Sequence, residues 1–137
     1  MRATTKFMIA GGSIGVALSA AAVAAPPERL ARLGQLAGGR WEMRMHDRTL
    51  PSEQICIRDG RQLIQLRHRQ QECERFVVSD EPNDVIVQYT CHGKGYGRTH
   101  IRLESDRLVQ IETQGIAEGL PFNFAAEGRW VSAACPG

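Results

Sequence analysis

The sequence predicts a mainly β domain, formed by a single curved antiparallel sheet or open barrel of about seven strands. One short helix is expected between the second and third strands and another at the N-terminus. Three observations predict this fold class. Short segments in which apolar and polar side chains alternate recur along the chain, turn-forming residues separate most of them, and one helical segment interrupts them. Consecutive strands linked by turns favour one antiparallel sheet, and a two-sheet sandwich is the alternative.

The chain begins with a segment that has the pattern of a secretory signal. Arg2 and Lys6 precede a long apolar stretch, and residues 1–24 contain no acidic side chain. The stretch ends in the small residues Ala22-Val23-Ala24, which a signal peptidase reads, so we expect a signal peptide over 1–24 with cleavage after Ala24. An uncleaved anchor is the alternative, but Gly and Ala insert weakly into membranes. We therefore expect a periplasmic protein with no membrane span after cleavage.

The charge balance changes when this leader is set aside. The remaining residues carry 15 basic and 15 acidic side chains and have no net charge. Nucleic-acid binding depends on an excess of basic residues, so the composition excludes it.

Residues 25–39 are expected to form a short amphipathic helix and a linker. Leucines recur every three residues after Pro27, where the helix is expected to begin, and Gly38-Gly39 ends it. The remainder, 40–137, is predicted to be one disulfide-braced β domain.

The first strands and the internal helix follow from changes in period. Two-residue alternation predicts a strand over 40–46, and a second strand over 54–58 would complete a hairpin. Asp59 is a good N-cap, and the helix-forming residues after it predict a helix of about three turns over 60–71.

The later strands are predicted from the same alternation. Residues 76–78 and 85–90 form the clearest hairpin, with the turn-forming segment 79–84 between them. A glycine-rich link over 93–97 follows, which we interpret as a turn or bulge rather than a phosphate-binding loop. The remaining predicted strands are 99–104, 109–114 and 122–131.

Four cysteines in a short exported chain predict two disulfides. Folding the clearest hairpin symmetrically about Pro82 places Cys73 opposite Cys91, with the Cβ spacing that a bridge needs. The remaining bridge is then Cys56 with Cys135. The hairpin register that places Cys73 opposite Cys91 also pairs Val77 with Val87 and Val78 with Ile86. The long intervals between the cysteines argue against a zinc site.

The histidines raise the question of acid/base or metal chemistry. His46 and His100 occupy outward-facing positions in the alternation of their predicted strands, and His92 borders the glycine-rich link. We therefore interpret all three as solvent-exposed. No serine or cysteine has the setting of a nucleophile. We therefore predict no catalytic residue, no metal ligand and no cofactor.

The apolar strand faces offer a possible binding surface. If the sheet curves without closing, its inner side chains line either a ligand cavity or a filled core, and a filled core is the favoured interpretation. The candidate residues for lining an apolar-ligand site are Trp41, Met43, Phe122 and Phe124.

The order of several short motifs resembles a known bacterial family. These motifs are Gly39-Arg40-Trp41-Glu42, Cys56-Ile57, Cys73, Cys91 and the terminal Cys135-Pro136. In this order the chain resembles the exported family catalogued as domain of unknown function 3617, over the whole mature domain. The resemblance implies a small periplasmic protein with two disulfides, and it implies no activity.

Three hypotheses about function follow. The first is a non-catalytic envelope protein that binds a partner or an apolar ligand through its curved sheet. The second is a small metal-dependent or acid/base hydrolase, which requires His46, His92 and His100 to converge beside a carboxylate. The third is a purely structural or stress-related envelope component, in which side chains fill the concavity of the sheet completely.

Overall fold

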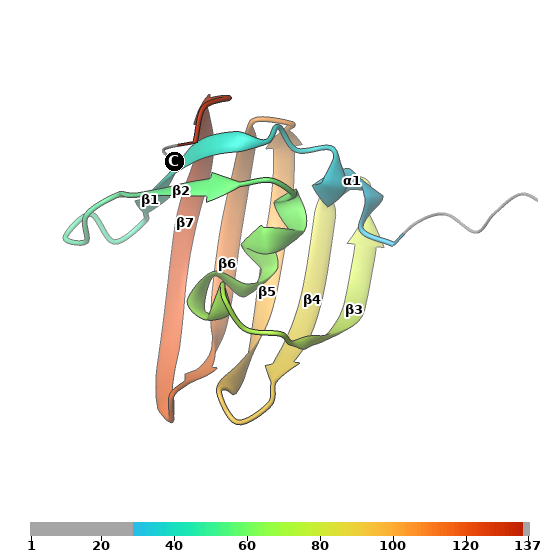
Figure 1. Ribbon diagram of the computed structural model, residues 1–137, viewed down its shortest axis with the longest axis vertical. Coiled ribbons are helices and arrows are strands. Elements are labelled where there is room, and N and C mark those ends of the chain that lie inside the picture. The colour runs from blue at the N-terminus through green and yellow to red at the C-terminus, as the bar shows by residue number, and fades with distance from the viewer. Residues whose placement is uncertain (1–28, 136–137) are drawn as a thin grey trace, which may run out of the picture.

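The computed structural model describes residues 29–135, which form one seven-stranded antiparallel sheet with two short helices (Figure 1). The predicted signal peptide, its cleavage site after Ala24 and the expected helix start at Pro27 lie outside the described residues. The helices are α1 (Ala31–Gly34) and the 3-10 helix η1 (Gly60–His68). The strands are β1 (Gly39–Met45), β2 (Glu53–Ile57), β3 (Glu74–Glu81), β4 (Asp84–Cys91), β5 (Gly95–Ser105), β6 (Leu108–Ala117) and β7 (Leu120–Ser132).

The strand order is β2-β1-β7-β6-β5-β4-β3, with β2 and β3 at the two edges. Strands β3 to β7 follow one another as a meander, whereas β1 pairs with β7 at the other end of the domain. All seven strands belong to one sheet that does not close, so the predicted single open sheet is confirmed.

The sheet curves, and both helices cover the same face of it (Figure 1). Strands β1 and β2 cross over that face, so the core lies between the curved sheet, η1 and α1. The alternation that predicts the strands explains this arrangement: in β4 the side chains of Val85, Val87 and Tyr89 are buried, while those of Gln88 and Thr90 are exposed.

Helix α1 is a single turn and is much shorter than the spacing of the leucines in this segment suggests. Leu30, Leu33 and Leu36 are all buried, as their three-residue spacing predicts, but Leu30 has a left-handed backbone with φ 60°. Burial of the leucines therefore does not depend on a long helix. No described helix is long and apolar enough to cross a membrane.

Helix η1 begins where the sequence predicts but differs in type and length. Asp59 caps its first turn and forms a capping box with Gln62. The predicted helix over 60–71 is present but shorter and of another type, because η1 is a 3-10 helix that is interrupted at Gln65 and ends at His68. Gln65 has non-helical backbone angles (φ −124°, ψ 52°), and its amide nitrogen donates to the carbonyls of His68 and Gln71. These bonds replace a regular helical ladder.

The β3–β4 hairpin contains a β-bulge that the sequence does not reveal. Val77 pairs with Val87 as predicted, but Ser79 rather than Val78 lies opposite Ile86. The predicted pair of Val78 with Ile86 is therefore wrong. The reason is the turn, which contains only residues 82–83, so that Glu81 pairs with Asp84. Symmetric folding about Pro82 would instead pair Glu81 with Asn83, which is a shift of one residue. The extra residue in β3 absorbs the difference.

The structure contains two disulfides, in the pairing that the hairpin register predicts. Cys73, which immediately precedes β3, forms a disulfide with Cys91 at the end of β4, and their Cα atoms are 4.2 Å apart. Cys56 in β2 bonds to Cys135, with a Cα separation of 5.6 Å. The second bridge attaches the segment after β7 to the edge strand of the sheet.

Candidate ligand-binding pocket

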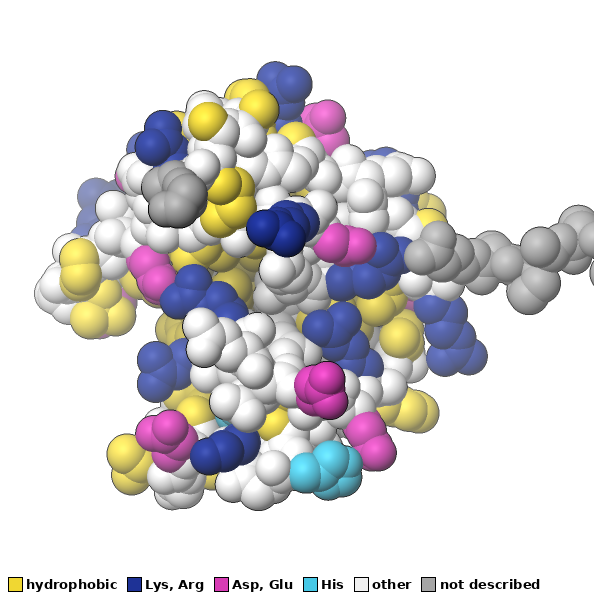
Figure 2. Space-filling view, viewed as in Figure 1, with side chains coloured by type: hydrophobic (Ala, Val, Ile, Leu, Met, Phe, Trp, Pro, Cys, Tyr) yellow, Lys and Arg dark blue, Asp and Glu magenta, His cyan; other side chains and the backbone are white. Residues whose placement is uncertain are grey.

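An apolar pocket of about 190 Å³ lies on the inner side of the sheet, where β1, β2 and β7 meet the second half of η1. Figure 2 views this side and shows hydrophobic side chains at the bottom of a hollow below the β1–β2 hairpin, with basic side chains beside it. The lining residues are Met43, Met45, Leu50, Glu53, Ile55, Leu66, Arg67, Arg69 and Phe124.

Each apolar lining residue is positioned by the phase of its element. Met43 and Met45 are two residues apart in β1 and therefore share the inner face. Phe124 in β7 and Leu66 in η1 pack against the buried core without being fully covered. Leu50 belongs to the loop between β1 and β2 and is 50% exposed, so it forms the lip of the pocket.

The rim of the pocket carries two arginines and one glutamate. Arg69 forms an ion pair with Glu53 at 2.5 Å, and both side chains are about half exposed. The guanidinium of Arg67 lies 5.9 Å from the centre of the Phe122 ring. An ion pair this exposed contributes at most about 1 kcal/mol, so an anionic group can displace Glu53 from Arg69 at little cost.

The four residues predicted to line an apolar site lie in different environments. Met43 and Phe124 line the pocket. Trp41 is fully buried in the core, and its ring nitrogen donates to the carbonyl of Ala37 at 2.8 Å. Phe122 is half-buried beside Phe124 and does not line this pocket. Sequence reasoning missed the contribution of η1, because its apolar residues are scattered among basic ones.

The three histidines that the hydrolase hypothesis requires contact three different partners. His46 contacts Gln110, His92 contacts Glu74, and His100 contacts Asp84. Within residues 29–135, no group of three or more His, Cys, Asp or Glu side chains is arranged to hold a metal ion. The convergence that this hypothesis predicts does not occur at these positions.

The fourth histidine is buried, which the sequence does not indicate. His68 is 4% exposed and contacts the carbonyl of Lys94 and the hydroxyl of Tyr89, each at 3.1 Å. Because a carbonyl can only accept, Nε2 carries the proton, and Nδ1 accepts from Tyr89. Burial raises the pKa of Tyr89 to about 12. Both ring nitrogens of His68 thus have structural partners.

Comparisons with protein-family models, with curated proteins and with solved structures found no match to this chain.

Proposed function

We propose that this chain is an exported, non-catalytic envelope domain that binds an apolar ligand in the pocket between β1, β2, β7 and η1. The observation that carries the proposal is an apolar pocket on the inner side of the sheet, with two arginines and one glutamate at its rim. The ligand class that fits is an anionic amphiphile, which has an apolar chain for Met45 and Phe124 and an acidic head for Arg67 and Arg69.

The size of the pocket restricts how such a ligand binds. Pockets that hold drug-sized ligands have volumes of about 300 to 1,000 Å³, and this pocket has about 190 Å³. It therefore accepts one end of an alkyl chain rather than a whole lipid. The acidic head would stay at the rim, within reach of Arg67 and Arg69, where solvent still contacts it.

Export to the periplasm is supported by the leader pattern and the two disulfides. Disulfides form and persist in oxidising compartments such as the bacterial periplasm. The resemblance to the exported family catalogued as domain of unknown function 3617 agrees with this location. A purely structural role would leave the concavity filled by side chains, and the open pocket favours ligand binding over that alternative.

Titration calorimetry with dodecanoate, kept below its micelle concentration, tests the proposal. We expect saturable binding to the oxidised protein. Leu50→Asp puts a carboxylate at the lip, where it repels the acidic head and removes apolar contact, so we expect binding about tenfold weaker. Dodecyltrimethylammonium, which has the same chain and a cationic head, should bind more weakly than dodecanoate.

Val131→Asp is the matched control. Val131 is an exposed apolar residue of β7 (41%) and does not line the pocket. This variant should bind dodecanoate as the wild type does. Absence of saturable binding, or an equal loss in both variants, contradicts the proposal.

A further inference from the structure

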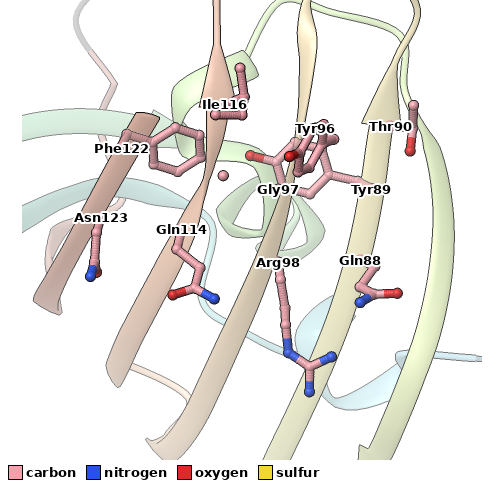
Figure 3. A pocket seen from close by; sticks show the side chains of 11 residues that line it. Gln88, Tyr89, Thr90, Tyr96, Gly97, Arg98, Gln114, Ile116, Phe122 and Asn123 are labelled. Carbon is pink, nitrogen blue, oxygen red and sulfur yellow. The ribbon is translucent and has the colours of Figure 1, made fainter. Parts of the chain in front are cut away.

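The face of the sheet opposite η1 carries a straight row of polar side chains across four neighbouring strands (Figure 3). Gln88 of β4 pairs with Arg98 of β5, Arg98 pairs with Gln114 of β6, and Gln114 pairs with Asn123 of β7. Directly paired residues share a face, so the four side chains lie side by side at the strand spacing of about 4.8 Å. We call these four residues the polar row.

The polar row lies in a shallow depression of this outer face. One hollow of about 570 Å³ extends from the row towards Tyr96 and Ile116, and a second of about 450 Å³ extends towards His100 and Glu112. Both hollows include Arg98, Gln114 and Asn123. Tyr96 is 55% exposed and lies two residues from Arg98 on the same strand and face, so its ring borders the row (Figure 3).

Within residues 29–135, the polar row has no side-chain partner, although polar groups in nearby rows of the same face do. His100 pairs with Asp84 at 2.6 Å, and Glu127 accepts from Arg129 and Gln110. Among the described residues, none of the four side chains of the row takes part in a side-chain hydrogen bond or ion pair. The guanidinium of Arg98 therefore has its fork of donors available for an external carboxylate.

We propose that the polar row binds an acidic saccharide, with Arg98 holding a carboxylate of the sugar. The amides of Gln88, Gln114 and Asn123 each donate and accept, which matches a ligand with hydroxyls at regular intervals. The exposed Tyr96 ring offers a flat apolar surface for a sugar face. Arg98 is the one charged side chain of the row, and in the described part of the chain Glu112 borders the second hollow without an ion pair to it. The guanidinium therefore favours a carboxylate-bearing sugar over a neutral one.

An acidic peptide fits this face less well. Extended peptides bind to sheets mainly by adding to an edge strand through backbone hydrogen bonds. The polar row lies across β4, β5, β6 and β7, and each of these strands is already paired on both sides. Recognition here must use side chains alone, which suits a hydroxyl-rich ligand.

Titration calorimetry with tetragalacturonate and with its methyl ester tests the proposal on the oxidised protein. We expect saturable binding of the acid and about tenfold weaker binding of the ester, because the ester cannot form the charge-assisted pair with Arg98. Arg98→Gln should weaken binding of the acid by about tenfold and leave binding of the ester unchanged. Tyr96→Ala should weaken both.

Arg102→Gln is the matched control, since Arg102 lies on the same strand and face as Arg98 and borders neither hollow. It should leave binding of the acid unchanged, and equal weakening by the two substitutions would show only general charge attraction and overturn the proposal. Absence of saturable binding, or equally tight binding of tetraglutamate, would overturn it as well. Leu50→Asp should not affect saccharide binding, so failure at the apolar pocket and failure at this row are distinguishable.

Discussion

Tyr89 shows how burial of one polar side chain makes stability depend on pH. Its ring is almost fully buried in β4, and its hydroxyl donates to His68 of η1. The neutral hydroxyl has a partner in the core, whereas a phenolate there would be poorly solvated. This is why burial raises its pKa to about 12, above the ordinary value of 10.0.

The raised pKa predicts a loss of stability in alkaline solution. Below pH 10 Tyr89 is neutral in both states, but between pH 10 and about pH 12 only the unfolded chain ionises there, so the free energy of unfolding falls. The loss from this residue should approach roughly 3 kcal/mol. Tyr89→Phe should show a shallower decrease than wild type in urea unfolding measured from pH 8 to 12.

Tyr96→Phe is the control, because it also replaces a tyrosine in this sheet but at an exposed position. It should keep the alkaline decrease of the wild type. If the wild-type and Tyr89→Phe curves run parallel, ionisation of Tyr89 does not drive the loss.

Gln65 is the residue at which helix η1 is interrupted. Its side chain is buried, its amide nitrogen donates to two backbone carbonyls, and its amide oxygen accepts from Arg75 at 2.8 Å. The residue thereby links the end of η1 to β3. A glutamine in a helix-forming stretch gives no sign of such a role in the sequence, because its partners come from the fold.

Removing the Gln65 amide should destabilise the protein. Gln65→Ala leaves two backbone carbonyls and Arg75 with fewer hydrogen-bond partners, and we expect a loss of about 2 to 3 kcal/mol in the free energy of unfolding. Gln70→Ala changes an exposed glutamine nearby and should cost less than about 0.5 kcal/mol. Urea unfolding of both variants measures the difference, and a similar cost for the two would remove this role for Gln65.

The alternation of side chains predicts the buried face of each strand, but it does not predict the register of β3 against β4, which depends on the turn between them. Alternation placed the buried faces of β4 to β6 correctly, because side chains alternate between faces in any strand. The register of β3 against β4 changes at Val78, and only the two-residue turn at 82–83 explains it. The pairing of Cys73 with Cys91 was still predicted, because the bulge lies between the turn and the cysteines.

The two disulfides of the domain close loops of different length. Cys56 and Cys135 are 79 residues apart, and Cys73 and Cys91 are 18 residues apart. A longer loop restricts the unfolded chain more, with expected contributions of about 4 and about 3 kcal/mol. The long bridge also joins the segment after β7 to β2, although neither element pairs with the other in the sheet.

Paired serine substitutions test this order. Cys56→Ser with Cys135→Ser should lower the free energy of unfolding by about 1 kcal/mol more than Cys73→Ser with Cys91→Ser. Urea unfolding measures the loss.

Mass spectrometry of the wild type without reductant tests the disulfide pairing itself. It should show a mass lower by four hydrogens than that of the reduced chain, and a peptide pair joining residues 73 and 91. A peptide joining 56 to 73 would contradict both the register and the comparison of the two bridges.

The amino-acid sequence is sufficient to predict the fold class, the approximate positions of the strands and the disulfide pairing. These depend on local alternation and on one hairpin, so neighbouring residues suffice to predict them. Three features depend on the folded arrangement: β1 pairs with β7, His68 is buried, and Met43 lines a pocket whereas Trp41 lies in the core. Curvature of the sheet and the position of η1 bring together residues that are far apart in the chain. Patterns among neighbouring residues do not predict these long-range contacts.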